Sequence, residues 1–166
     1  MANGDQRALR SFYEEHYAAL VRFIGNRLGD PIEAADVAQE TFLSVWRQAG
    51  RFKGRSSVKT WMFSIARNKA VDRLRRVRPE EALDERFDPP DESFDLDRMV
   101  DAAGDVLRVR ACVSTLGEAQ RRAVQLAYYE GFTYGDIAVI EDVPEGTIKT
   151  RIYHAKRLLM RCLTRR

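Results

Sequence analysis

The sequence predicts an all-α protein made of two small helical domains, at residues 5–78 and 106–166, joined by an acidic flexible linker at 79–105. In both predicted domains apolar residues recur at spacings of three and four, which is the period of an amphipathic helix. No segment of any length alternates apolar and polar residues as a half-buried strand does. The linker is rich in acidic residues and holds three of the five prolines, a composition typical of a segment that builds no core.

Three helices are expected in the first domain, at residues 8–28, 31–49 and 58–77. Gly29 follows the first helix where a C′ glycine would end it. Asp30 can then act as the N-cap of the second helix, with Pro31 at its first position and Glu33 closing a capping box. These residues predict a tight connection between the first two helices.

Four helices are expected in the second domain, at residues 106–114, from 118 to near 131, from the capping sequence 133–136 to 140 or 141, and from 144 or 145 onward. The segment Thr115 to Glu118 has the pattern of a capping box. A short helix, a turn of about three residues and a longer helix form the layout of a helix-turn-helix. We therefore expect this motif at the end of the chain.

Charge is segregated along the sequence although the formal net charge is only +3 and the pI is about 9.0. Such segregation favours an anionic partner more than the total charge does. Cys112 and Cys162 form no CxxC pair, so we expect neither a disulfide framework nor a metal site, and we interpret Cys162 as a small buried apolar residue. No stretch resembles a signal peptide or reaches membrane-spanning length, so we expect a cytoplasmic protein without membrane insertion.

The last helix has a basic polar side. Its apolar positions, Ile148, Ile152, Ala155, Leu159 and Cys162, recur at spacings of three and four and should face inward. The residues expected to lie wholly or partly outward are Thr147, Lys149, Thr150, Tyr153, His154 and Arg157. Basic and hydroxyl groups on one face suit phosphates and base edges of a duplex. A solvated basic face is the alternative interpretation, and the two-helix layout favours DNA.

Two segments resemble a known family. "YYEGFTYGDIAVIEDVPEGTIKTRIYHAKRLL" is similar to region 4 of bacterial RNA polymerase sigma factors of the extracytoplasmic-function (ECF) group, in the sigma-70 family. "DVAQETFLSVWRQAGRFKGRSSVKTWMFSIARNKAVDRLRR" is similar to their region 2. Both occur in the family's order, and the resemblance covers nearly the whole chain except residues 79–105. It implies two helical domains that bind core polymerase and span the two halves of a promoter.

The resemblance implies a polymerase-binding face in region 2, directed at a basic coiled coil of the polymerase clamp. The matching residues are Asp36, Gln39, Glu40, Phe42 and Trp46. Asp36, Gln39 and Glu40 lie at i, i+3 and i+4, so a helix presents them on one stripe. Phe42 and Trp46 fit a core position as well as a contact. The family implies a second polymerase contact, between region 4 and the flap.

The resemblance also implies two promoter contacts. For the −10 element the matching residues are Phe52, Lys53, Arg55, Ser56, Trp61, Asn68, Asp72, Arg73 and Arg76. For the −35 element they are Glu145, Thr147, Lys149, Thr150, Arg151, Tyr153, His154 and Arg157. Cations interleaved with aromatic rings suit strand opening, since unpaired bases stack on rings while cations follow the backbone. Trp61 fits a core position equally well.

The sequence departs from the family at three positions. Gly117 stands where proline is usual, Asp142 where the turn usually has glycine, and Glu141 where an aliphatic residue is usual. Asp tolerates the left-handed conformation better than most residues but less well than glycine.

The function implied is a sigma factor that starts transcription at specific promoters, in a stress or environmental response, and is held by an anti-sigma factor. No nucleophile–base pair or phosphate-cradling glycine loop is evident, so we expect no enzyme activity and no cofactor. The alternative is an autonomous helix-turn-helix regulator, which would leave residues 51–76 without a role. A small nucleic-acid enzyme is a third hypothesis, for which Asp72 alone supplies too little chemistry.

Overall fold

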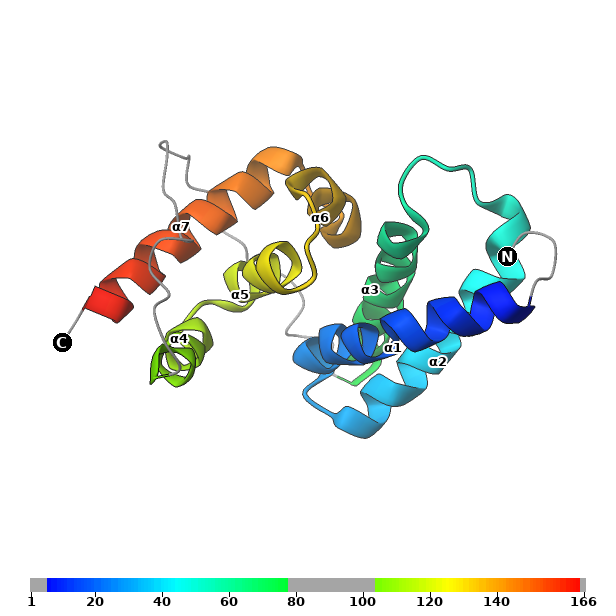
Figure 1. Ribbon diagram of the computed structural model, residues 1–166, viewed down its shortest axis with the longest axis horizontal. Coiled ribbons are helices and arrows are strands. Elements are labelled where there is room, and N and C mark those ends of the chain that lie inside the picture. Colours follow the sequence, from blue (N-terminus) through cyan, green and yellow to red (C-terminus); the bar gives the residue numbers. More distant parts are fainter. Residues whose placement is uncertain (1–5, 78–103, 165–166) are drawn as a thin grey trace. The chain divides into compact units, whose positions relative to one another are not determined.

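The computed structural model describes residues 6–77 and 104–164, and most of the predicted linker lies outside these residues. The chain divides into two compact units (Figure 1). Within the described residues every regular element is helical. The predicted all-α class is therefore confirmed.

The first unit consists of three long helices. They are α1 (Gln6–Leu28), α2 (Pro31–Gln48) and α3 (Val58–Val77), with a short 3₁₀ turn, Ala49–Arg51, after α2. Each of the three helices packs against the other two. Their shared core contains Leu20, Ile24, Val37, Met62 and Phe63, all fully buried. This packing fixes which faces of α2 and α3 remain exposed.

The connection between α1 and α2 forms as the sequence predicts. Gly29 has φ 71°, the left-handed conformation that a C′ glycine provides without a steric penalty. The Asp30 carboxylate accepts hydrogen bonds from the backbone N–H of Ile32 at 2.8 Å and of Glu33 at 3.2 Å. The predicted capping box is not completed, because the carboxylate of Glu33 binds Arg73 of α3 at 2.7 Å and does not reach back to Asp30.

The remaining helices follow after residue 103, and most of their residues belong to the second unit. They are α4 (Gly104–Ser114), α5 (Glu118–Val124), a π-helical segment (Gln125–Tyr129), α6 (Tyr134–Glu141) and α7 (Glu145–Thr164). The single helix expected from 118 to near 131 thus changes its hydrogen-bond pattern after Val124. Both α4 and α5 pack against α7. The core of this unit includes Leu126, Ile148, Ile152 and Ala155.

The capping box predicted at Thr115 to Glu118 is wrong. The N-cap of α5 is Gly117, which has no side chain to accept from the first turn. The Thr115 hydroxyl instead donates to the carbonyl oxygen of Cys112 at 2.7 Å and so completes the end of α4. Side-chain bonds of this local type compete with a capping role.

The start of α6 and the turn after it follow the prediction. The Asp136 N–H donates to Thr133 Oγ1 at 3.1 Å, and the Thr133 N–H donates to Asp136 Oδ2 at 3.3 Å. These reciprocal bonds form a capping box. Asp142 has φ 57°, so an aspartate occupies the left-handed position of the turn. The helix-turn-helix therefore retains its turn without glycine there.

A disulfide joins Cys112 of α4 to Cys162 of α7. The expectation of no disulfide, with Cys162 as a simple apolar residue, is therefore wrong. The two cysteines are 50 residues apart in sequence, and their Cα atoms come within 5.8 Å because α4 packs against α7. The spacing of two cysteines in the sequence does not predict a disulfide between residues so far apart. The bond fastens the end of α7 to the rest of the second unit.

Candidate functional site

The exposed face of α7 carries cationic side chains that a duplex could bind. Lys149 is exposed and pairs with exposed Glu145 one turn earlier, at 2.9 Å. Arg157 is exposed, and its guanidinium lies 5.7 Å from the centre of the Tyr153 ring. Stacking of this kind holds an arginine in place while its N–H groups stay available to acceptors. Lys149 and Arg157 thus belong to a basic face of α7.

Two residues of the predicted −35 set do not lie outward. Thr150 is only 7% exposed, and its hydroxyl donates to the Gly146 carbonyl at 3.0 Å. Arg151 is 8% exposed because it follows buried Ile148 by three positions, which places it toward the inward side of α7. The structure therefore contradicts the outward placement of Thr150, and it does not present Arg151 on the exposed face.

The rest of this set is partly accessible. Thr147, Tyr153 and His154 are half-buried. The Nε2 atom of His154 is buried and has no hydrogen-bond partner among the described residues. The Tyr153 ring meets the His154 ring edge to face, with centroids 5.4 Å apart. These side chains form the less exposed border of the basic face.

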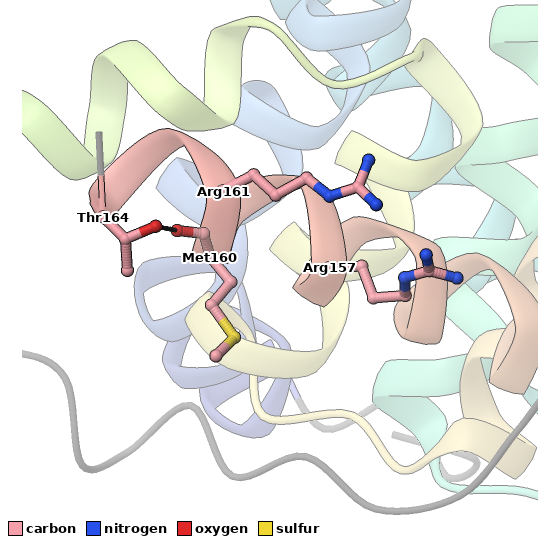
Figure 2. A pocket seen from close by; sticks show the side chains of 4 residues that line it. All are labelled: Arg157, Met160, Arg161 and Thr164. Carbon is pink, nitrogen blue, oxygen red and sulfur yellow. Dashed lines mark hydrogen bonds between the residues drawn. The ribbon is translucent and has the colours of Figure 1, made fainter.

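The same face continues toward the C-terminal end of α7. Four residues within two turns of this helix line a shallow pocket there: Arg157, Met160, Arg161 and Thr164. Figure 2 shows the side chains of Arg157, Arg161 and Met160 projecting from α7, and the Thr164 hydroxyl bonded to the Met160 carbonyl at 2.8 Å. Of the four, only Arg157 belongs to the predicted site. The exposed, basic side chain of Arg161 extends the cationic face by a further turn.

A tyrosine pair outside the predicted site joins Tyr128 to Tyr134 at the start of the helix-turn-helix. Burial raises the pKa of Tyr134, the first residue of α6, and the neighbouring Tyr128 raises this pKa further. Lys156 of α7 lowers the same pKa and lies 5.7 Å from the centre of the Tyr128 ring. Tyr134 is therefore neutral at pH 7 and retains its O–H donor. Apolar periodicity gives no indication of this cluster.

The predicted polymerase-binding stripe lies on the exposed side of α2. Asp36, Gln39 and Glu40 are all exposed. Two apolar residues that were not predicted extend the stripe: Ile32, 76% exposed, and Leu43, 53% exposed. An exposed helix face that mixes carboxylates with large apolar side chains is suited to a protein partner.

Phe42 does not belong to this exposed stripe. It is 5% exposed, and its ring packs against the rings of Phe12, Tyr13 and Tyr17 of α1, with centroids 6.2, 4.7 and 6.4 Å apart. Of the two interpretations left open by the sequence, the structure places Phe42 in the core. Trp46 is half-buried, so part of its ring reaches the surface.

The predicted −10 surface begins in the loop between α2 and α3. Lys53 and Arg55 are exposed there and Ser56 is half-buried. The half-buried ring of Phe52 packs on that of Trp61, with centroids 5.0 Å apart and the planes 34° from parallel. Trp61 therefore combines a packing role with partial exposure at the basic loop. A ring pair of this kind offers a stacking surface to an unpaired base.

Along α3 the predicted DNA contacts divide between two faces. Asn68, Asp72 and Arg76 are exposed. Arg73 instead points to α2, where its guanidinium binds Glu33 at 2.7 Å and Glu40 at 3.2 Å. Lys69, one turn earlier, pairs with Glu40 at 3.6 Å. The predicted polymerase-binding stripe and the predicted DNA-binding helix are thus joined by ion pairs.

The described part of the chain contains neither a metal-binding cluster nor a membrane-spanning helix. No group of three or more His, Cys, Asp or Glu side chains among these residues could hold a metal ion. None of the described helices is both long enough and apolar enough to cross a membrane. The candidate surfaces are therefore the exposed faces of α2, α3 and α7 together with the basic loop.

Comparisons with known proteins match both halves of the chain. A family model described as "Sigma-70 region 2" matches residues 12–80, and one described as "Sigma-70, region 4" matches residues 107–159. The chain is 31% identical to "ECF RNA polymerase sigma factor SigK" of Mycolicibacterium vanbaalenii, covering 98% of this chain and 85% of that relative. It is 34% identical to "ECF RNA polymerase sigma factor SigC" of Mycobacterium tuberculosis, covering 96% and 85%.

Solved structures with similar folds are complexes. The sigma factor RpoE with the anti-sigma factor NepR from Bartonella quintana matches with a TM-score of 0.60 and 27% identity, covering 95% of this chain and 99% of that chain. CnrH in complex with the cytosolic domain of CnrY matches with a TM-score of 0.65 and 23% identity, covering 98% and 91%. The second match shows a shared fold.

Proposed function

The chain belongs to the ECF group of the bacterial RNA polymerase sigma factors, and from this premise we propose that it directs core RNA polymerase to specific promoters. The observation that carries the proposal is that one chain holds both regions in order, each with an exposed face suited to its task. Sigma factors act by binding, so no catalytic residue is required. The chain would act in the cytoplasm, where polymerase and promoter DNA meet.

We assign residues 5–78 to polymerase binding and to recognition and opening of the −10 element. The stripe Asp36, Gln39 and Glu40 on α2 would meet a basic surface of the polymerase clamp, with Leu43 adding apolar contact. Charge complementarity of this kind speeds association and selects the partner. The basic loop and the outer side of α3 would bind the opened strand.

We assign residues 106–166 to the −35 element, with residues 79–105 as the connection between the two domains. The α7 helix would enter the major groove, with Lys149 near its N-terminal end and Arg157 two turns later. Recognition helices of helix-turn-helix proteins dock in this way. Arg161 would add a phosphate contact beyond the predicted set. The polymerase flap is the proposed protein partner of this domain.

We further propose that an anti-sigma factor holds the chain inactive until a stress or environmental signal releases it. The support is the likeness to RpoE, whose solved structure contains the anti-sigma factor NepR. An anti-sigma factor would cover the surfaces that polymerase requires. The exposed apolar side chains Ile32 and Leu43 on α2 would contribute to its binding site as well as to that of polymerase.

The proposal is tested by transcription from fragmented genomic DNA of the source organism with core polymerase, followed by sequencing of the transcript 5′ ends. Addition of the chain should give starts at a limited set of positions that core polymerase alone does not use. Asp36→Arg reverses an exposed charge in the polymerase-binding stripe and should abolish these starts while the helical content stays unchanged. Tight duplex binding without polymerase, and no new starts with it, would instead support the autonomous regulator.

A further inference from the structure

Four charged side chains form a bridge between α2 and α3. Arg73 donates through Nη1 to Glu33 at 2.7 Å and through Nη2 to Glu40 at 3.2 Å. The second oxygen of Glu40, Oε2, lies 3.6 Å from Lys69 Nζ. Both carboxylate oxygens of Glu40 are therefore engaged by cations of α3. We call Glu33, Glu40, Lys69 and Arg73 the α2–α3 charge cluster.

The cluster is electrically neutral, since two carboxylates face two cations. Its members are accessible: the side chains of Glu40 and Arg73 are 49% and 29% exposed. A neutral, self-paired group attracts a phosphate backbone weakly, because the carboxylates cancel the field of the cations. Arg73 and Lys69 are thus present on the DNA-binding helix but are held by the helix that faces polymerase.

We propose that Glu40 couples the two binding events: a cation of polymerase draws its carboxylate away from α3, and this frees Lys69 and the Nη2 group of Arg73 for the phosphates of the promoter strand. Glu33 stays bonded to Nη1 of Arg73 and acts as a positioning residue that holds the guanidinium in one place between α2 and α3. The inference rests on the proposed function, since it requires one chain to bind both polymerase and DNA. Coupling between two sites is reciprocal, so DNA would also strengthen polymerase binding.

The expected effect is moderate because the ion pairs are accessible to water. Exposed pairs change an equilibrium by at most about fivefold each. Glu40→Gln removes the competing carboxylate and should raise the affinity of the free chain for single-stranded DNA about two- to fivefold. Each additional phosphate contact should also steepen the dependence of log K on log salt concentration by about 0.7.

The experiment measures fluorescence anisotropy of a labelled oligo(dT) strand with the full chain over a series of salt concentrations. The matched control is Asp36→Asn, which removes an exposed carboxylate one turn earlier on α2 but outside the charge cluster. If the cluster acts as proposed, Glu40→Gln binds oligo(dT) more tightly and with a steeper salt dependence than wild type. Asp36→Asn should change neither quantity appreciably. An equal rise in affinity for oligo(dT) in both variants would mean that the change in net charge alone explains the effect. That result would overturn the proposal.

A double-mutant cycle then tests the coupling itself. With Lys69→Gln and Arg73→Gln in place, the further change Glu40→Gln should no longer raise affinity, because the cations that it would free are absent. An unchanged gain in this background overturns the proposal. In the complex with core polymerase, the affinities of wild type and Glu40→Gln for the same strand should converge, and a persisting difference also contradicts it.

These outcomes separate the inference from the proposed function. If the wild-type chain fails to bind core polymerase while Glu40→Gln still strengthens oligo(dT) binding, the cluster holds its cations as inferred and the sigma-factor proposal fails. If the wild-type chain directs transcription but Glu40→Gln leaves the salt dependence unchanged, the function stands and the coupling through Glu40 is wrong.

Discussion

Phe42 occupies the centre of an aromatic cluster and illustrates how one residue of a binding motif can serve the core instead. Its ring contacts Phe12, Tyr13 and Tyr17 of α1 and is 5% exposed, whereas the next residue, Leu43, is 53% exposed. Helical geometry turns successive side chains by about 100°, so neighbours in sequence face different surroundings. A match to a motif therefore does not show which of its residues are exposed for binding and which are buried in the core.

Phe42→Ala should lower the free energy of unfolding of the first unit by about 3–5 kcal/mol, because it leaves a cavity among three rings. Both tryptophans of the chain, Trp46 and Trp61, lie in this unit, so urea unfolding followed by their fluorescence reports the change. Leu43→Ala is the control and should shift stability by no more than about 0.5 kcal/mol. If the Phe42→Ala variant had the same free energy of unfolding as wild type, the placement of Phe42 in the core would be contradicted.

At the scale of the element, α7 divides into an inward apolar side and an outward basic side. Ile148, Ile152, Ala155 and Leu159 are buried, while Lys149 and Arg157 are exposed. The helix is fastened at two places, by the turn at Asp142 and by the disulfide of Cys162. A recognition helix held at both ends can present its basic side in one orientation, which lowers the ordering cost of binding DNA.

Lys149→Ala and Arg157→Ala should each weaken duplex binding and reduce the slope of log K against log salt concentration by about 0.9, because each removes a phosphate neutraliser. Anisotropy of a labelled duplex measures both quantities. Arg110→Ala, which removes an equal charge from an exposed position on α4, should leave the slope unchanged. A uniform effect of all three variants would show that total charge, not the α7 face, binds DNA.

Reduction of the disulfide, or its removal by Cys112→Ser, should lower the stability of the second unit only. A closed loop of about 50 residues corresponds to about 4 kcal/mol in the chain-entropy model. Circular dichroism follows both units, whereas tryptophan fluorescence follows the first unit. Dithiothreitol should therefore lower the helical transition of the second unit and leave the fluorescence transition in place. If dithiothreitol shifted both the helical and the fluorescence transitions, or neither of them, the result would contradict a disulfide that stabilises only the unit of α4 and α7.

Much of the local structure could be predicted from the sequence where one or two turns of chain decide it, although the capping box at Thr115 to Glu118 was not predicted correctly. The Asp30 N-cap, the Gly29 terminus and the Thr133–Asp136 capping box all depend on neighbours within four residues. The disulfide and the α2–α3 charge cluster could not be predicted, since they join residues 50, 33 and 40 positions apart. To predict the burial of Arg151, one must know which side of α7 faces the core to within one residue. Apolar periodicity does not define this side so closely.

At the scale of the whole molecule, two helical units carry different binding surfaces on one chain. The first has an acidic and apolar stripe on α2 next to a basic helix, α3, and the second has α7, a helix with a basic exposed side. Each unit is small, so its stability depends on a limited core and, in the second unit, on the disulfide. Small modules of this kind bind tightly when both engage one target, because the second contact is then intramolecular.

The most direct test of the account is whether core polymerase is required for this chain to open promoter DNA. A promoter recovered from the transcription experiment is probed with permanganate, which oxidises unpaired thymines. The account predicts reactive thymines in the −10 element only when the chain and core polymerase are both present, and their loss with Asp36→Arg. Opening by the chain alone, or no opening with polymerase, would contradict it.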